Sequence, residues 1–434
     1  MLDLLIKNAN LPDGRAGIDI AILEGKFETI APAIDAEAKE VISASGRLVS
    51  PPFVDPHFHM DATLSLGTPR LNRSGTLLEG IALWGELKPQ LTHEAVVERA
   101  MRYCDLAVSQ GLLSIRTHVD ICDDRLLAVD ALLEVRDKVR PYIDLQLVAF
   151  PQDGLFRAAG TEKNLLRALD KGVDVVGGIP HFERTMQDGA TSVQRLCEIA
   201  AARSLPVDMH CDETDDPMSR HIETLSAETV RLGLQGRVAG SHLTSMHSMD
   251  NYYVSKLIPL MAEAQIHAIP NPLINITLQG RHDTYPKRRG MTRVPELMAA
   301  GINVALGQDC CMDPWYSLGS ADMLEVAHMA VHVAPMTSID AMKRLFDAVT
   351  VNSARAMGLD SYGIKEGNPA NCVLLQARDP VEAIRLKATR LVVIRDGEVI
   401  AETQPRTSLV NLPDRRNVID PADYAPVETS TGAA

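Results

Sequence analysis

Short apolar runs alternate with longer amphipathic segments through most of this 434-residue chain. Stretches such as HEAVVERAMRYCDLAVSQG and NYYVSKLIPLMAEA have the periodicity of helices. Between such segments lie eight predicted strands: RLVSPPFVDPHFH, LLSIRTHVD, IDLQLVAFPQ, VDVVGGIPHFE, PVDMHCDE, RVAGSHLT, IHAIPNP and INVALGQD. Eight successive β/α repeats predict an α/β protein with a TIM-like (β/α)8 barrel, which we place at residues 51–359.

The two ends of the chain have a different pattern, in which apolar and polar residues alternate over short distances. DLLIKNA and IDIAILEGKFETIA lie near the start, and NCVLLQA and LVVIRDGEVIAET lie near the end. Asp396-Gly397 is a strong hairpin signal. We expect residues 1–50 and 360–411 to form one small β-sandwich. The polar tail 412–434 is predicted to be a surface extension whose last few residues are disordered.

Composition excludes some classes of partner. The formal net charge is −14, which disfavours binding to nucleic acid or to anionic membranes. No run of 18 apolar residues and no secretion signal is visible. The seven cysteines are scattered and include no CxxC pair, which indicates reduced thiols and a cytoplasmic location.

Polar side chains collect where the predicted strands end, and active sites of such barrels lie at the carboxyl ends of the strands. His57 and His59 are two residues apart, so on an extended strand their imidazoles point to the same side. The other candidates at strand ends are His118, Asp120, Gln152, His181, Glu183, His210, Glu213, His242 and Asp309. These positions together predict one active site built from most of the strands.

A subset of these residues predicts a metal centre. The candidate ligands are His57, His59, His210 and Asp309. Imidazoles with one carboxylate suit one divalent ion, Fe²⁺ or Zn²⁺, with a coordination position left open for water. Such an ion lowers the pKa of a bound water towards ~7. The alternative for His210 is a core histidine, and Cys310 or Cys311 is a weaker candidate because Asp309 already supplies a ligand.

Three further residues have the chemistry of catalysis or recognition. Glu213 and His242 are candidates to move protons. Gln152 offers one acceptor and two donors, which suits another amide edge. The alternatives are a loop carboxylate in CDETDD for Glu213 and a surface glutamine for Gln152. His118 and His181 also lie at strand ends, a position that allows them to line the pocket without binding metal, and the sequence does not assign them a role.

Several long motifs resemble the bacterial cytosine deaminases of the amidohydrolase superfamily. They are PHFHMD, FPQDG, HCDETDD, SHLTSMHS, NPLINITLQGRHDTYPKRRGMTRV and DPWYSLG, and the resemblance runs from about Leu5 to Pro405. It implies a barrel with a single iron or zinc ion, the same four ligands, a flanking β-sandwich and a small-molecule pyrimidine substrate. It also implies a homo-oligomer, commonly a hexamer. Strand four, VDVVGGIPHFE, lacks the lysine that bridges two metals in other relatives.

The resemblance also implies roles for individual residues. Gln152 reads the amide edge of the pyrimidine, and Trp315 packs at the pocket wall. Glu213 delivers a proton to the ring nitrogen. His242 and Asp309 handle the proton of the attacking water.

One departure from the family pattern bears on the substrate. The family usually has His-Asp-Asp where this chain has Gln308-Asp309-Cys310. Cys310 therefore replaces an aspartate expected near C5 of the pyrimidine. We predict deamination of cytosine to uracil and of 5-methylcytosine to thymine. The alternatives are a related cyclic amidine (isocytosine, isoguanine, creatinine or an aminotriazine) and a metal-free barrel with a structural role.

Overall fold

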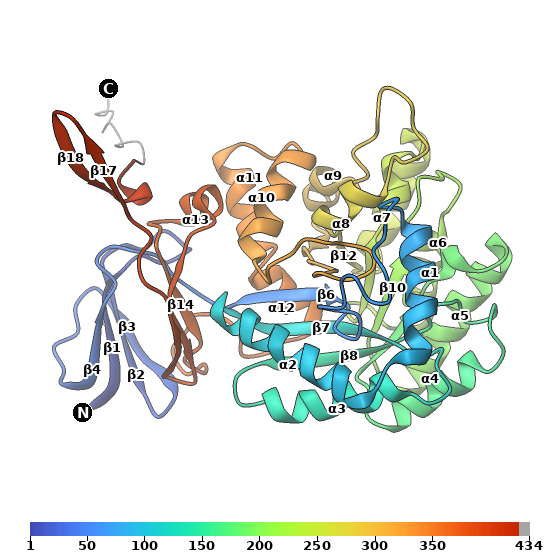
Figure 1. Cartoon of the computed structure of the whole chain (residues 1–434), viewed down its shortest axis with the longest axis horizontal. Helices are drawn as coiled ribbons and strands as arrows, with labels where there is room; N and C mark the ends of the chain where they lie inside the picture. Colours follow the sequence, from blue (N-terminus) through green and yellow to red (C-terminus); the bar gives the residue numbers. More distant parts are fainter. Residues whose placement is uncertain (425–434) are drawn as a thin grey trace. The chain divides into compact units, whose positions relative to one another are not determined.

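The computed structural model describes residues 1–424 and divides into two compact units (Figure 1). Phe53–Asp360 form the larger unit, and Met1–Pro52 together with the chain from Ser361 onward form the smaller one. The predicted disorder of the last few residues concerns 425–434, which lie outside the described residues.

The larger unit is the predicted barrel, with all eight strands parallel and neighbouring in chain order. Helices lie outside these strands (Figure 1). The strands are β6 (Phe53–Phe58), β7 (Leu112–Asp120), β8 (Asp144–Phe150), β9 (Val175–Gly178), β10 (Val207–Cys211), β11 (Val238–His242), β12 (His267–Ile269) and β13 (Asn303–Val304). The helices are α1 (Leu77–Leu87), α2 (His93–Ser109), α3 (Leu127–Val139), α4 (Thr161–Asp170), α5 (Met186–Arg203), α6 (His221–Leu232), α7 (Asn251–Glu263), α8 (Pro272–Leu278), α9 (Val294–Ala299), α10 (Met323–Val333), α11 (Ile339–Asp347) and α12 (Val351–Met357).

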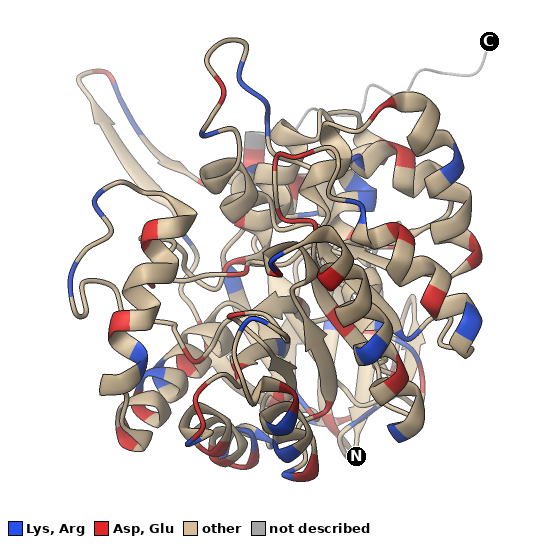
Figure 2. Cartoon of the chain, turned by 90° about the vertical axis from the view of Figure 1, so that its right-hand side faces the viewer, with Lys and Arg blue, Asp and Glu red and all other residues tan. Residues whose placement is uncertain are grey.

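The helices have the local signals that the sequence pattern predicts. In α2, Thr92 caps the first turn by accepting a hydrogen bond from the Ala95 amide. The buried residues of α2 recur at helical spacing: Val96, Ala100, Tyr103, Cys104 and Ala107. Acidic and basic residues are interspersed on the helices around the barrel (Figure 2). These helices therefore bury one stripe and leave a mixed-charge face to solvent.

The barrel closes at the residues that follow β13. Phe58 at the end of β6 bridges Asp309 in parallel. The Asp309 amide donates to the His57 carbonyl at 2.8 Å, and the His59 amide donates to the Asp309 carbonyl at 2.9 Å. The backbone thus fixes Asp309 beside the HxH segment, although the two are some 250 residues apart in sequence.

The smaller unit packs two four-stranded sheets around one apolar core, as predicted. One sheet contains β1 (Leu2–Ala9), β2 (Ile18–Leu23), β3 (Lys26–Ala31) and β4 (Ala38–Ser43). The other contains β5 (Val49–Ser50), β14 (Cys372–Leu375), β15 (Arg390–Arg395) and β16 (Glu398–Glu402). Asp396 and Gly397 turn between β15 and β16 with φ of 49° and 81°, which the predicted hairpin requires. Helix α13 (Pro380–Leu386) lies between β14 and β15 in the chain.

Two details differ from the sequence prediction. The expected first barrel strand is two strands, because Pro51 and Pro52 interrupt it and β5 pairs with β14 in the smaller unit. A hairpin, β17 (Ser408–Leu412) and β18 (Arg415–Ile419), also crosses the expected boundary between the β-sandwich and the polar extension at residues 411 and 412. All seven cysteines are free. Among residues 1–424, no helix combines the length and the apolar character needed to cross a membrane.

Candidate metal centre and active site

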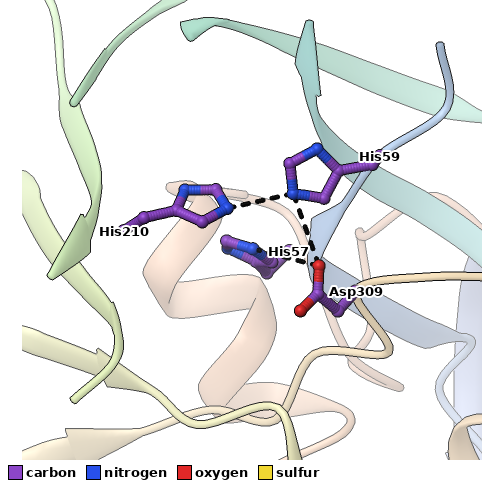
Figure 3. Close-up of side chains that lie close together, drawn as sticks. All are labelled: His57, His59, His210 and Asp309. Atoms are coloured by element: carbon purple, nitrogen blue, oxygen red, sulfur yellow. Dashed lines mark hydrogen bonds and ion pairs between the residues drawn. The ribbon is translucent and has the colours of Figure 1, made fainter. Parts of the chain in front are cut away.

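Four predicted ligands converge at the carboxyl ends of the strands (Figure 3). His57 lies on β6, His59 directly follows it, and His210 lies on β10. Asp309 comes from the closing segment. One ligand atom from each residue lies within 4.8 Å of all the others, and all four side chains are buried. The structure therefore brings together residues from three distant parts of the sequence.

The donor atoms of this cluster fit a divalent cation. His59 Nε2 and His210 Nε2 are 3.0 Å apart, and His59 Nε2 is 3.4 Å from Asp309 Oδ1. His57 Nε2 is buried without a hydrogen-bond partner among the described residues and faces Asp309 Oδ1 at 3.6 Å. Three imidazole nitrogens and a carboxylate oxygen aimed at one point match the ligands of zinc and iron sites.

Burial sets the protonation of the cluster. Burial, reinforced by neighbouring imidazoles, lowers the pKa of His57, His59 and His210 well below the usual range. Neutral imidazole is the form that binds a metal. Burial and the nearby Glu213 carboxyl raise the pKa of Asp309. A bound cation would oppose that shift and favour the carboxylate.

Two candidate proton carriers lie beside the ligands. His242 ends β11, with Nε2 3.8 Å from Asp309 Oδ2 and Nδ1 3.6 Å from Glu213 Oε1. Burial raises the pKa of Glu213 to about 8, so its carboxyl holds a proton at neutral pH. The Asn275 amide donates to His242 Nδ1 at 2.9 Å, which leaves Nε2 as the protonated nitrogen towards Asp309.

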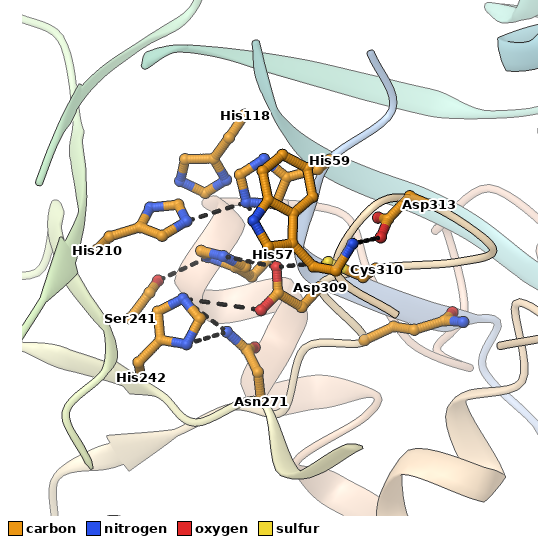
Figure 4. Close-up of polar contacts among 12 residues, drawn as sticks. His57, His59, His118, His210, Ser241, His242, Asn271, Asp309, Cys310 and Asp313 are labelled. Atoms are coloured by element: carbon orange, nitrogen blue, oxygen red, sulfur yellow. Dashed lines mark hydrogen bonds and ion pairs between the residues drawn. The ribbon is translucent and has the colours of Figure 1, made fainter. Parts of the chain in front are cut away.

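The side chains of Asn271 and Asn275 contact His242, and the sequence analysis did not single them out. Both belong to the segment NPLIN, and Asn271 Nδ2 lies 3.3 Å from His242 Nδ1 (Figure 4). Both asparagines are fully buried. The motif containing them was part of the family resemblance, but nothing in its spacing points to His242, which lies on β11, whereas the motif begins helix α8.

Strained backbone accompanies the site residues at three strand ends. Asp212, His242 and Asp309 have φ of 55°, 67° and 71°, in the left-handed region that non-glycine residues rarely adopt. Asp212 is held there because its carboxylate accepts hydrogen bonds from Ser219 Oγ at 2.6 Å and from the Ile222 amide at 2.8 Å. These bonds tie the loop that carries Glu213 to the start of α6.

A pocket opens onto these groups at the carboxyl ends of the strands. Gln152, Glu213, His242 and Asp309 are among its polar lining residues. Its apolar wall contains Leu77, Ile81, Ile179, Phe182, Ile274 and Leu278. An apolar slot with a few convergent polar groups suits a flat, weakly polar ring.

Comparison with known proteins identifies the family of this chain. The amidohydrolase family matches residues 40–401. The chain belongs to the amidohydrolase family. The 5-methylcytosine deaminase from Klebsiella pneumoniae, liganded with 5-fluorocytosine, superimposes with a TM-score of 0.91 at 42% identity, over 95% of this chain and 100% of that one. The predicted resemblance and the predicted barrel fold are thereby confirmed.

Two other relatives of this chain have names that refer to different substrates. N-isopropylammelide isopropyl amidohydrolase from Pseudomonas sp. (strain ADP) is 28% identical over 93% of this chain and 98% of that protein. Pterin deaminase from Rhizobium rhizogenes is 30% identical over 91% of this chain and 90% of that protein.

The predicted substrate contacts of this amidohydrolase all line the pocket: Gln152, Cys310 and Trp315. Burial and then Asp309 raise the pKa of the Cys310 thiol, so it is neutral. Asp313 Oδ1 accepts from the amides of Trp315 and Tyr316, both at 2.9 Å, and so holds the turn that carries the indole.

A glycine makes room for that indole. Gly80 lies on α1, and a Cβ added there would lie 2.3 Å from Trp315 Cδ1. A real Cβ cannot approach so closely, so the indole can occupy this place only because residue 80 has no side chain. Sequence reasoning missed Gly80, because a glycine within a helix gives no hint of a distant tryptophan.

The remaining predicted residues have other positions. His181 lines the pocket, whereas His118 does not and instead lies behind His57, with ring centroids 4.2 Å apart. Of these two strand-end histidines, only His181 is therefore part of the pocket lining. Asp120 accepts from Trp84 Nε1 at 2.8 Å, and Glu183 accepts from the Leu155 amide at 2.5 Å. These two carboxylates therefore stabilise the positions of Trp84 and of the backbone at Leu155.

Proposed function

We propose that this amidohydrolase deaminates a free pyrimidine base, converting cytosine to uracil and 5-methylcytosine to thymine with release of ammonia. One observation carries the proposal: the same pocket is lined by three of the four candidate ligands, His59, His210 and Asp309, and by Glu213, His242 and Gln152. The likeness to the 5-methylcytosine deaminase from K. pneumoniae supports the same substrate class.

We further propose that the cofactor is one divalent ion per chain, Fe²⁺ or Zn²⁺, held by His57, His59, His210 and Asp309. When bound, such an ion supplies a water of lowered pKa as the nucleophile. The chain provides neutral imidazoles and a buried carboxyl for that purpose.

The surrounding residues account for the other steps. Gln152 pairs with the amide edge of the ring and orients the amine-bearing carbon towards the ligand cluster. Glu213, protonated at neutral pH, donates to the ring nitrogen and makes that carbon more electrophilic. Asp309 accepts one proton of the incoming water and passes it to the amine, which leaves as ammonia, while the protonated Nε2 of His242, 3.8 Å from Asp309 Oδ2, donates a hydrogen bond to that water. The remaining proton of the attacking oxygen returns to Glu213 as the carbonyl forms.

Cys310 supports acceptance of a methyl group at C5. A carboxylate at this position would lose hydration when a methyl group is pressed against it, which carries a free-energy penalty. A neutral thiol behaves as a small, weakly polar hydrophobe. Burying one methyl against it contributes up to ~0.8 kcal/mol.

A second candidate is an amino-substituted ring of related chemistry, such as an aminotriazine. The likeness to N-isopropylammelide isopropyl amidohydrolase along 93% of this chain favours it. The ligand cluster and proton carriers would serve that reaction equally, so only the ring contacts separate the two.

An ammonia-release screen on metal-loaded protein tests the proposal. The substrates are cytosine, 5-methylcytosine, isocytosine, creatinine and an aminotriazine. We expect release from cytosine and 5-methylcytosine, with uracil and thymine as products. Release confined to any of the other compounds would overturn the substrate assignment. The proposed homo-oligomer, expected to be a hexamer, is checked by light scattering on the same sample.

A further inference from the structure

A buried polar cluster lies behind the ligand His57, away from the substrate pocket. It consists of Arg116, His118, Asp208 and Ser241, whose exposed fractions are 2% for Arg116 and 0% for the others. None of the four lines the pocket. Figure 4 shows Ser241 and His118 close to the His57 ring, on different sides of it. Polar groups buried this deeply need partners, so their hydrogen bonds are informative.

The strand register places these side chains together. Asp208 and His210 are two residues apart on β10, so both point into the barrel. Ser241 on β11 pairs with His210 in the parallel register. Ser241 Oγ is 2.7 Å from Asp208 Oδ1 and 2.9 Å from His57 Nδ1.

The chemistry of these groups decides the direction of each hydrogen bond. Arg116 Nη1 lies 3.2 Å from Asp208 Oδ2, and this pairing favours the ionised carboxylate, which can only accept. Ser241 has one hydroxyl proton, and it must therefore donate that proton to Asp208. The lone pairs of Ser241 Oγ then face His57 Nδ1, which must carry the other proton.

We propose that Asp208 and Ser241 are positioning residues that fix the tautomer of His57. With Nδ1 protonated towards Ser241, the lone pair of Nε2 points at the ligand cluster. His57 Nε2 is the atom that faces Asp309 at 3.6 Å and has no hydrogen-bond partner among residues 1–424. A histidine ligand whose other nitrogen donates to a fixed acceptor binds metal more tightly than an unsupported one.

A second metal site is the competing interpretation of this cluster. His57, His118 and Asp208 have ligand atoms within 4.8 Å of one another. However, the Arg116 guanidinium already neutralises Asp208, and a further cation would lie beside that buried positive charge. The contacts therefore favour a hydrogen-bond relay from Asp208 through Ser241 to His57.

The relay rests only on the metal part of the proposed function, so the test measures metal binding without substrate. Zn²⁺ affinity is measured by chelator competition on metal-stripped protein. Ser241→Ala removes the hydroxyl, and Ser241→Cys keeps a side chain of similar size with a much weaker hydrogen-bonding group. Ser226→Ala is the matched control, because Ser226 is equally buried but, among residues 1–424, its hydroxyl donates only to the Ile222 carbonyl, at 2.8 Å.

We expect Ser241→Ala and Ser241→Cys to bind Zn²⁺ about 10- to 100-fold more weakly than the parent, and Ser226→Ala to stay within about twofold. If Ser241→Ala does not fold, Ser241→Cys decides alone. Parental affinity in folded Ser241→Cys overturns the relay, even if its Tm is lower. Equal weakening in Ser226→Ala also overturns it. The parent's own affinity tests the metal centre separately from the relay.

Discussion

The pocket has two sides that are built differently. On the metal side, His57 and His210 lie within strands, and Asp309 is held by backbone hydrogen bonds to His57 on β6 and to His59 just after it. On the substrate side, Gln152 follows the end of β8, and Cys310 and Trp315 lie on the loop after the barrel closes. The strands and the residues bonded to them thus hold the candidate metal ligands, which determine the type of reaction. The loops hold the residues that contact the substrate ring and determine which ring is accepted.

Because the two sides are supported separately, the substrate preference can change while the metal ligands stay in place. The metal side is supported by parallel strand pairing and by the Asp208–Ser241–His57 contacts. The substrate side depends on local contacts that position Trp315, namely the turn held by Asp313 and the space left by the missing side chain at Gly80. We therefore expect substitutions on the metal side to abolish turnover, and those on the substrate side to change efficiency or preference.

The largest expected effect is that of His210→Ala. This change removes one ligand and should eliminate nearly all metal occupancy and turnover. Metal analysis and ammonia release on the same sample check the prediction. His332→Ala, at an exposed position on α10, is the control and should match the parent. A metal-free His210→Ala protein with full activity would refute the ligand assignment.

Glu213→Gln should have the next largest effect. The amide keeps the shape of the side chain but cannot deliver a proton, so kcat should fall roughly 10²-fold or more. Metal content should stay at the parental level, because Glu213 is outside the ligand cluster. Loss of metal in this variant would instead make Glu213 a ligand.

Gly80→Ala tests the substrate side by steric means. The new Cβ would displace Trp315, and we expect kcat/KM to fall roughly 10- to 100-fold with metal content unchanged. Gly85→Ala on the same helix is the matched control, since a Cβ there meets nothing within 4 Å. If both variants behave like the parent, the position of Trp315 does not govern substrate binding.

The smallest predicted effect concerns Cys310→Asp. Introducing the family's carboxylate should lower kcat/KM for 5-methylcytosine relative to cytosine by about fourfold, the factor that corresponds to ~0.8 kcal/mol for one methyl group. The measurement is kcat/KM for both bases in parent and variant. An unchanged ratio would show that Cys310 does not set the preference at C5.

Sequence reasoning recovered the parts of this structure that have a local signal. The eight strands follow from apolar runs, and the four candidate ligands follow from their residue types at strand ends. The role of Gln152 was inferred from its amide chemistry and its place at a strand end, whereas the role of Trp315 depended on family resemblance alone. Contacts such as Ser241 with His57, or Gly80 with Trp315, join residues 184 and 235 positions apart. No periodicity encodes such pairs, because they arise only when the barrel closes.

The most direct test of metal-dependent deamination is a metal titration of the stripped, folded chain with 5-methylcytosine present. Ammonia and thymine formation should rise linearly with added Fe²⁺ or Zn²⁺ and level off at one equivalent per chain, because four buried ligands define one site. Turnover by the metal-free chain, or no ammonia at one equivalent of bound metal, would contradict metal-dependent deamination as the function of this pocket.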